Sequence, residues 1–486
     1  MAIKEDLIAI VGARYLFDDE KRLTPYSRDY SLSAPGMPDY VVQPSNSAEV
    51  QKIVRLANKY RMPVVPCSSG IHFYGTTIPG QGGIVIDLKR MNRILGIDER
   101  NRMARIEPGV TWEQLQPELR KHDLMAISPL LPHPLKSAVT SHLEREPGLI
   151  PRFEYTDTLV NVEMVLPDGE LIRSGSTCVT DFPDKSVADG VNPSGPSAVM
   201  WPRLVQGAQG TLGIITWAMV KVEYRPKVNK TWFIPLESLA KSIELVYKVQ
   251  RREIGAECFI LNNVNLAAIL ADKWPEDFNA LREQLPAWTI ILVLDGGKRF
   301  PEDKIAYQED ALNQVVDGLA IPTLRTSLPG APGWERDLPD MLRTAWPKQR
   351  TYWKFAGKGS CQDLFFHTTL NKAPAFTDAL IEVAARHDYP AGEIGFYIQP
   401  LVYGGACHFE GNFAYNPANN EEIARLKGLI AEAAEVTLSM GGFFTRPYGL
   451  INDMVYSQAA SYTPLLKKVK KMLDPNNVLS PGRLCF

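Results

Sequence analysis

"SSGIHFYGTTIPGQGGIVIDL", residues 68–88, places many small residues between two short apolar runs. A hairpin turn needs one or two glycines, whereas this connection contains nine Ser, Thr and Gly residues: Ser68, Ser69, Gly70, Gly75, Thr76, Thr77, Gly80, Gly82 and Gly83. Such a lightly covered backbone lets peptide N–H groups approach a bulky anion, although a long, mobile surface loop has the same composition. The flanking runs "RMPVVPC" and "GIVIDL" are rich in β-branched residues and predict buried strands, which favours the binding loop.

The composition is that of an ordinary globular protein, with 486 residues, 45% of them hydrophobic and 22% charged. This length predicts two domains, or one domain with a large insertion. The net charge is −2 and no basic block occurs, which argues against a nucleic-acid partner.

The N-terminus has no apolar stretch of signal-peptide length, and no run of about eighteen apolar residues occurs anywhere. The six cysteines are scattered without CxxC pairs, which predicts a reducing compartment and neither a zinc site nor an iron–sulfur cluster. We therefore expect a cytoplasmic protein without a membrane span. If it exchanges electrons with haem or iron–sulfur groups, a partner chain must carry them.

Hydrophobic periodicity divides the chain into three parts. Residues 1–225 contain a strand–helix–strand pattern over residues 40–66, whose helix opens with a serine cap, and a strand pair over residues 210–224. Residues 226–445 alternate longer helical patterns with strands and predict an α+β segment of their own. Residues 446–486 form a tail with one helical pattern.

A second small-residue segment, "QGAQGTLGIIT", contains Gly207, Gly210 and Gly213. It follows the first loop by about 130 residues, so two close-approach loops could contact one large ligand. No G-x-G-x-x-G opens a helix after a first strand and no G-x-x-x-x-G-K-[ST] occurs. The sequence therefore gives little support to a Rossmann NAD site and excludes a P-loop.

Five stretches in this order resemble the flavoproteins of the vanillyl-alcohol oxidase / p-cresol methylhydroxylase (PCMH) family: "VVPCSSGIHFYGTTIPGQGGIVIDLKRMNRILGID", "ARIEPGVTWEQL", "LVNVEMVLPDGELIRSG", "LVQGAQGTLGIIT" and "LDPNNVLSPGRL". The resemblance implies an α+β, two-domain PCMH-type FAD-binding fold. Residues 226–445 would form the cap over the flavin ring, and residues 446–486 would return to the FAD domain. The cofactor-binding residues that it implies are Pro66, Ser68, Ser69, Gly70, Ile71, His72, Gly75, Thr76, Gly207, Gly210, Thr211, Gly213, Ile214 and Arg483.

The branch of the family that oxidises 4-substituted phenols holds a phenolate with tyrosines and an arginine, beside an acidic residue near flavin N5. Tyr74, Arg446 and Glu144 occupy the similar positions in this sequence. A phenolate needs a fixed cation and hydroxyl donors, and a carboxylate steers a proton or water. The sequence departs from the pattern at Thr445, where the branch has tyrosine, and at Tyr448, which replaces or follows a lost histidine.

The glycolate/D-lactate-dehydrogenase-like branch is the second choice. Its His-x-Gly-Asp-Gly-Asn stretch, which with a C-terminal Glu-His-Gly binds a metal, is echoed in part by "CHFEGNF" with His408. The Glu-His-Gly is missing here, so we expect no metal. His408 is then either a satisfied strand histidine or a pocket-lining acid or base.

Some relatives attach FAD covalently through a histidine just before Leu-Phe-Phe in the cap, and Asp363 takes that position here. Other relatives use a histidine in the pyrophosphate loop, which leaves His72 as the one candidate. Aspartate does not form the bond, so we expect non-covalent FAD.

The resemblance implies an FAD-dependent oxidoreductase that transfers hydride from a small aromatic alcohol or 4-substituted phenol to flavin N5, with Glu144, Arg446, Tyr74 and His408 as the catalytic candidates. A 2-hydroxy-acid dehydrogenase is the alternative substrate class. In another class altogether, the chain would be the flavin-bearing electron-transfer subunit of a larger complex. The electron acceptor would be O2 or a cytochrome, an iron–sulfur protein or an electron-transferring flavoprotein, and the resemblance suggests a homo-oligomer or complex.

Overall fold

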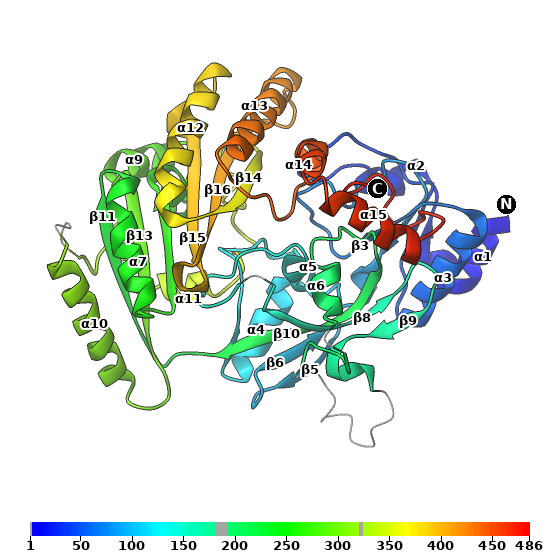
Figure 1. Cartoon of the computed structure of the whole chain (residues 1–486), viewed down its shortest axis with the longest axis horizontal. Coiled ribbons are helices and arrows are strands. Elements are labelled where there is room, and N and C mark those ends of the chain that lie inside the picture. Colours follow the sequence, from blue (N-terminus) through cyan, green and yellow to red (C-terminus); the bar gives the residue numbers. More distant parts are fainter. Residues whose placement is uncertain (1, 155, 180–191, 198, 320–323) are drawn as a thin grey trace.

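The computed structural model describes residues 2–154, 156–179, 192–197, 199–319 and 324–486. These residues form three β-sheets, two in the N-terminal half and one between residues 228 and 415. Figure 1 shows the third sheet with α12 and α13 at the left, and the N-terminal helices α1 and α3 at the right. No described helix has both the length and the apolar character needed to cross a bilayer.

The first sheet is a small, mostly parallel sheet with the strand order β1-β2-β4-β3. Its strands are β1 (Leu16–Phe17), β2 (Tyr40–Val42), β3 (Val64–Cys67) and β4 (Ile84–Asp87), and its helices are α1 (Ala2–Val11), α2 (Glu20–Leu23) and α3 (Ser47–Tyr60). The strand–helix–strand prediction is confirmed, because β2, α3 and β3 follow one another in it. The predicted serine cap is wrong: Asn46 caps α3 and accepts the backbone N–H of Glu49.

The second sheet has the order β5-β6-β10-β8-β9, and β7 also pairs with β10. Its strands are β5 (Ile94–Asp98), β6 (Met103–Ile106), β7 (Leu124–Ala126), β8 (Leu159–Val165), β9 (Leu171–Arg173) and β10 (Ile214–Tyr224). The strand pair predicted over residues 210–224 is wrong, since β10 is one eleven-residue strand. No Gly, Pro, Asn or Asp interrupts β10, so nothing favours a turn within it. The helices of this part are α4 (Trp112–Lys121), α5 (Ala138–Leu143) and α6 (Trp201–Val205).

The third sheet is antiparallel, with the order β11-β13-β12-β15-β16-β14. Its strands are β11 (Val228–Leu236), β12 (Glu257–Asn262), β13 (Trp288–Gly296), β14 (Ser360–Thr368), β15 (Ile394–Leu401) and β16 (Ala406–Tyr415). Alternate residues enter two cores: Ile290 and Leu292 face one, Ile291 and Val293 the other.

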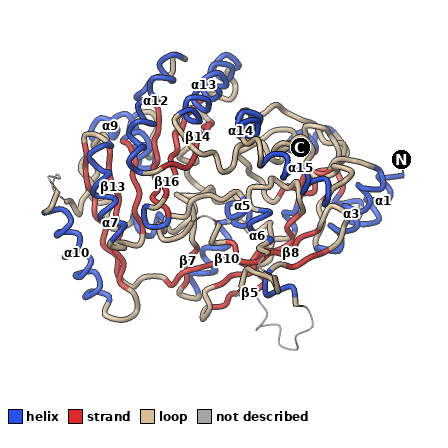
Figure 2. The backbone as a smooth tube through the Cα atoms, in the orientation of Figure 1, coloured by secondary structure: helices blue, strands red, loops and turns tan. Residues whose placement is uncertain are grey.

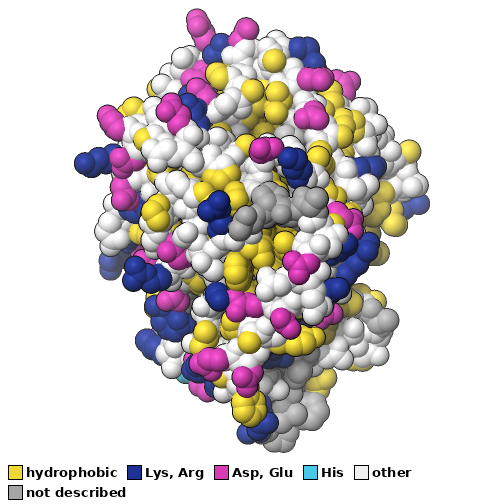
Figure 3. All heavy atoms as spheres, turned by 90° about the vertical axis from the view of Figure 1, so that its left-hand side faces the viewer, with side chains coloured by type: hydrophobic (Ala, Val, Ile, Leu, Met, Phe, Trp, Pro, Cys, Tyr) yellow, Lys and Arg dark blue, Asp and Glu magenta, His cyan; other side chains and the backbone are white. Residues whose placement is uncertain are grey.

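Helices cover both faces of this sheet. The first core contains residues of α7 (Ile243–Arg251), α10 (Pro301–Asp317), α12 (Ala373–Arg386) and α13 (Asn420–Ser439). The second contains residues of α8 (Asn263–Leu270), α9 (Glu276–Gln284) and α11 (Leu338–Leu342). Viewed from the left-hand side of Figure 1, the surface carries positive and negative side chains without one dominant basic patch (Figure 3).

The C-terminal segment returns to the N-terminal part. It contains α14 (Asn452–Gln458) and α15 (Tyr462–Leu473), and Leu479 then forms a parallel bridge with Val64 of β3. In Figure 2, loop segments fill the region between the third sheet and α5 and α6. These loops carry the residues of the candidate site.

Candidate functional site

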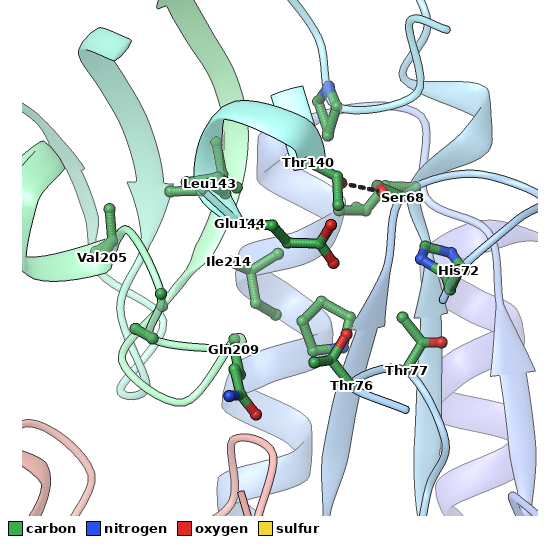
Figure 4. Close-up of a pocket in the computed structure, with 18 of the residues that line it drawn as sticks. Ser68, His72, Thr76, Thr77, Thr140, Leu143, Glu144, Val205, Gln209 and Ile214 are labelled. Carbon is green, nitrogen blue, oxygen red and sulfur yellow. Dashed lines mark hydrogen bonds between the residues drawn. The ribbon is translucent and has the colours of Figure 1, made fainter. Parts of the chain in front are cut away.

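A cavity lies between the loop after β3, helix α5 and the loop before β10 (Figure 4). The figure shows the Glu144 carboxylate at its centre, with Ser68, His72, Thr76 and Thr77 on one side. We refer to it as the first cavity. Of the fourteen predicted cofactor-binding residues, eight line it: Pro66, Ser68, His72, Thr76, Gly207, Gly210, Gly213 and Ile214.

The other six predicted cofactor-binding residues do not line the first cavity. Ser69, Gly70 and Ile71 line a separate cavity, which His72 also lines. Gly75 donates its backbone N–H to Asp29 Oδ2 over 2.6 Å, and the Thr211 hydroxyl donates to the Ala208 carbonyl over 2.6 Å. Arg483 donates to the Ile78 carbonyl. These contacts hold the loops together.

The loop after β3 presents backbone donors without acceptors. Within the described chain, the peptide N–H groups of Ser68, Gly70, Ile71 and His72 donate to no protein oxygen. Ser68, Ile71 and His72 are buried residues, whereas Gly70 is exposed. Buried backbone N–H groups are almost always paired, so the three buried residues indicate a ligand that supplies acceptors. Successive N–H groups in such a turn form an anion-binding concavity, which fits a pyrophosphate.

The two loops pack directly against each other. At Gly210, where φ is +75°, an added Cβ would lie 2.7 Å from Pro66 Cγ. At Gly207, where φ is +78°, it would lie 2.5 Å from Arg145 Nη2. Both positions therefore require glycine for conformation, and Gly210 requires it for space as well, because the Pro66 ring cannot move aside as the end of the Arg145 side chain can.

His72 is buried and has local partners. Its Nε2 lies 2.9 Å from the Ser69 carbonyl and 3.2 Å from Cys67 Sγ. Burial lowers the pKa of His72 to about 4, so the imidazole is neutral at neutral pH. An Nε2–H that donates to Ser69 gives His72 a role in shaping the loop.

A second cavity lies between the N-terminal part and the third sheet. Five aromatic side chains line it: Phe73, Tyr74, Tyr352, Trp353 and Tyr397. Its charged lining residues are Lys136, Glu146, Lys354, Asp363, Glu410 and Arg446. An aromatic enclosure with a few fixed polar groups is typical of a small-molecule site.

The structure brings three of the four predicted catalytic residues together here. Tyr74 donates its hydroxyl to Glu146 Oε1 over 3.1 Å and stacks on Tyr448, with ring centroids 4.6 Å apart. Arg446 donates to the backbone carbonyl of Glu144. Tyr448 lines the first cavity and Tyr74 the second, so this ring pair stands where the two cavities approach.

Sequence reasoning missed Lys136, which joins the carboxylates at this place. Its Nζ donates to Glu144 Oε2 over 2.7 Å and to Glu146 Oε1 over 2.6 Å. Burial raises the pKa of Glu144. At Glu146, burial is outweighed by Lys136 and Arg446, and the pKa is lowered. A lone lysine in the apolar stretch "PLLPHPLKSAV" is the only signal in the sequence.

His408, the fourth catalytic candidate, lies behind the second cavity in a separate cluster. Its Nε2 is 3.1 Å from Glu410 Oε2, and burial lowers its pKa. Lys354 Nζ lies 2.6 Å from Asp363 Oδ2 and 2.7 Å from Glu410 Oε1, which neutralises part of the cluster. In the described part of the chain, no group of three or more His, Cys, Asp or Glu side chains is arranged to hold a metal ion.

Two family models match the chain. Residues 38–175 match the FAD binding domain, and residues 368–484 match the C-terminal domain of FAD linked oxidases. The first match contains the loop with unpaired N–H groups, and the second contains Arg446. The predicted cofactor, FAD, is thereby confirmed.

Characterised relatives of nearly equal length fall into both predicted branches. The glycolate oxidase subunit GlcD of Bacillus subtilis is 24% identical, covering 99% of this chain and 96% of the relative. The flavoprotein subunit of 4-cresol dehydrogenase (hydroxylating) of Pseudomonas putida is 23% identical, covering 98% and 93%. The predicted preference for the phenol branch is therefore not resolved.

The fold matches that of a solved flavoprotein. The crystal structure of p-cresol methylhydroxylase with substrate bound superposes with a TM-score of 0.84 at 19% identity, covering 100% of this chain and 96% of that one. The predicted α+β, two-domain PCMH-type fold is confirmed. The boundaries at residues 225 and 445 stay a prediction.

Proposed function

Because the chain is an FAD-linked oxidoreductase of the FAD-binding PCMH-type family, we propose that it dehydrogenates a small aromatic alcohol or a 4-substituted phenol. The aromatic lining of the second cavity beside the first is the observation that carries this proposal. An aromatic ring gains contact area and favourable ring–ring geometry between such side chains.

Arg446 and Tyr74 hold the anionic or hydroxyl oxygen of the substrate in this proposal. The Arg446 guanidinium carbon lies 4.2 Å from the Phe365 ring centroid, which fixes its plane. Burial lowers the pKa of Arg446, but Tyr74, Tyr448 and the nearby carboxylates outweigh burial and raise it, so the charge is permanent. A fixed planar cation suits a carboxylate or a phenolate.

Glu144 takes the hydroxyl proton of an alcohol substrate, or orients water, at the wall of the first cavity. When bound, FAD supplies the acceptor for the hydride that leaves the substrate carbon. Lys136 holds the Glu144 carboxylate in place, and Glu146 keeps the Tyr74 hydroxyl oriented. We further propose that FAD is held without a covalent bond, since Asp363 is bound to Lys354 and the His72 nitrogen to Ser69.

A 2-hydroxy-acid substrate is the second candidate. Arg446 lines the second cavity, and its guanidinium can bind a substrate carboxylate through two parallel hydrogen bonds. The similarity to a glycolate oxidase subunit supports it. The relatives described as subunits also support a redox partner protein as electron acceptor.

The test is anaerobic stopped-flow reduction of the holoenzyme's flavin. One set of substrates contains 4-alkylphenols and 4-hydroxybenzyl alcohols, and the other contains glycolate, D-lactate and 2-hydroxyglutarate. We expect rapid bleaching by the phenols and a loss of about 30-fold or more in Arg446→Ala, the range for removing one partner of a buried charged contact. Arg446→Lys keeps the positive charge but loses the planar guanidinium with its paired N–H donors, and it should recover part of the rate of flavin reduction.

Bleaching by the hydroxy acids alone would replace the phenol proposal with the second candidate. Bleaching by neither set, in a protein that still binds FAD, would contradict both. Hydrogen peroxide formation under air would show that O2 serves as acceptor.

A further inference from the structure

Among the described residues that line the first cavity, none is a lysine or an arginine, and Glu144 supplies the one carboxylate. FAD carries a negative pyrophosphate, and its ring gains negative charge on reduction at neutral pH. A cation close behind this wall would therefore attract the cofactor at short range, with little water between them to screen the charge.

Arg145 occupies such a position. Its guanidinium packs on Gly207, which lines the first cavity, so that a Cβ there would lie 3.0 Å from Cζ and 3.1 Å from Nε. Its backbone φ is +53°, the left-handed region that non-glycine residues rarely adopt. Its Nη2 donates to the Thr445 carbonyl, next to Arg446 in sequence.

The Glu154 carboxylate acts on this cation only from beyond ion-pair distance. Within the described residues Arg145 makes no ion pair, and its Nε is buried without a hydrogen-bond partner. Four other cations with little exposed side-chain surface each pair with a carboxylate: Lys136, Lys354, Arg343 and Lys470. Burial lowers the pKa of Arg145. A half-buried guanidinium without an ion pair gains stability when a counter-charge binds beside it.

We propose that Arg145 is the counter-charge of the flavin and raises its midpoint potential. On reduction, the cofactor takes two electrons and one proton and becomes an anion, while Arg145 neither gains nor loses a proton. The guanidinium stabilises that anion more than the neutral oxidised ring. The inference relies on the proposed placement of Glu144 beside the reacting atoms, because Arg145 follows it in the chain.

The test is a redox titration of the holoenzyme against a reference dye, with dithionite as reductant and no substrate. We expect Arg145→Met to lower the equilibrium constant for two-electron reduction at least tenfold, equivalent to about 30 mV. Arg145→Lys should keep most of the potential because it keeps the charge. Sulfite, which adds to the oxidised ring and leaves it negatively charged, should bind at least tenfold more weakly to Arg145→Met.

Arg350→Met is the matched control. Arg350 also donates to a backbone carbonyl, that of Ala271, but it pairs with the Asp272 carboxylate at 3.0 Å and is remote in sequence from the residues of the first cavity. The flavin midpoint potential of Arg350→Met should equal that of the unmodified protein. If Arg145→Met does not retain FAD, the comparison of Arg145→Lys with Arg145→Gln in excess FAD serves instead.

Equal potentials in the Met and unmodified proteins, with FAD bound, would overturn the inference. Weaker FAD binding at an unchanged potential would also overturn it and assign Arg145 to the pyrophosphate. Because no substrate enters the titration, failure of the proposed phenol or hydroxy-acid reaction would leave these outcomes distinct.

Discussion

Lys136 and Lys354 each lie between two carboxylates at the wall of the second cavity. Burial of such groups is strongly unfavourable unless every charge has a partner of good geometry. Two carboxylates surround each lysine, Arg446 adds positive charge near Glu144 and Glu146, and His408 lies beside Glu410. These clusters are thus poised to respond to protons or to a charged ligand.

Lys136→Met should destabilise the fold by about 3–5 kcal/mol at pH 7, because Glu144 and Glu146 are left buried without their cation. The folded pKa of Glu146 is depressed, so its stabilisation is present above its ordinary pKa near 4.5 and lost as pH falls through the folded pKa. Without Lys136, burial raises the pKa of both carboxyls above the ordinary value, as it already does for Glu144, so the deficit of the variant should shrink between pH 7 and pH 5 as they protonate. Urea unfolding at both pH values measures this.

Lys121→Met serves as the control for that experiment. Lys121 also pairs with a carboxylate, Glu118 Oε2 at 2.6 Å, but both side chains are exposed. Its deficit should stay below about 1 kcal/mol at either pH. A Lys136→Met deficit that is equally small would contradict the buried cluster.

Gly207→Ala should weaken FAD binding by about tenfold or more. The new Cβ would require a left-handed backbone and would overlap the Arg145 guanidinium at 2.5 Å. Gly392→Ala is the control, since its φ is ordinary and nothing lies within 4 Å of the added atom. Flavin fluorescence during titration of the apoprotein measures both affinities, and an unchanged affinity in Gly207→Ala would refute the required glycine.

The residues of the site could be predicted only where they belong to a motif. Tyr74, Glu144 and Arg446 stand at motif positions, whereas Lys136, Lys354 and Arg145 show their roles only through distant neighbours. His408 stands in a partial match to a family motif, yet its side chain contacts Glu410 behind the second cavity. Side-chain contacts between separate segments depend on the assembled fold and cannot be predicted from local sequence patterns.

At the scale of elements, α15 and the strand-like residues after it secure both glycine-rich loops. Lys470 of α15 donates to the Thr211 and Leu479 carbonyls and to Asp474 Oδ2, and Asp474 accepts the backbone N–H groups of Val478 and Leu479. Leu479 in turn pairs with β3, whose end begins the first loop. One buried lysine thus connects the C-terminus with the walls of the first cavity.

Lys470→Met should cost about 3–5 kcal/mol, because Asp474 is fully buried and loses its cation. We also expect weaker FAD binding, since both loops lose an anchor. Lys471→Met, at the exposed neighbouring position, is the matched control and should be within about 0.5 kcal/mol of the unmodified protein. Thermal unfolding of both variants decides this. Identical melting curves would show that α15 is not an anchor.

The elements were largely predictable because their local signals are strong. β2, α3 and β3 follow from period-3.6 and β-branched patterns, and the Thr111 capping box marks the start of α4. The exception is β10: a long apolar strand has no internal signal of its length, and its three partner strands lie elsewhere in the chain. The cap at Asn46 was missed because serines flank it on both sides.

At the scale of the whole molecule, the first cavity joins parts that are far apart in sequence. Its wall takes Ser68 and Thr76 from the loop after β3, Thr140 from α5, Gly210 from the loop before β10, and Tyr448 from the C-terminal segment. A ligand that spans this cavity therefore binds several parts at once and stabilises the folded state by mass action.

FAD should raise the melting temperature of the apoprotein by a few degrees, because saturation at about 100 times Kd contributes about 2.7 kcal/mol. Riboflavin at the same concentration should give little of this shift, since it lacks the pyrophosphate that the unpaired N–H groups of Ser68, Gly70, Ile71 and His72 would bind. Adenosine diphosphate without the flavin should recover part of it. Differential scanning fluorimetry with the three ligands separates these contributions, and equal shifts from riboflavin and FAD would mean that the loop does not hold the phosphates.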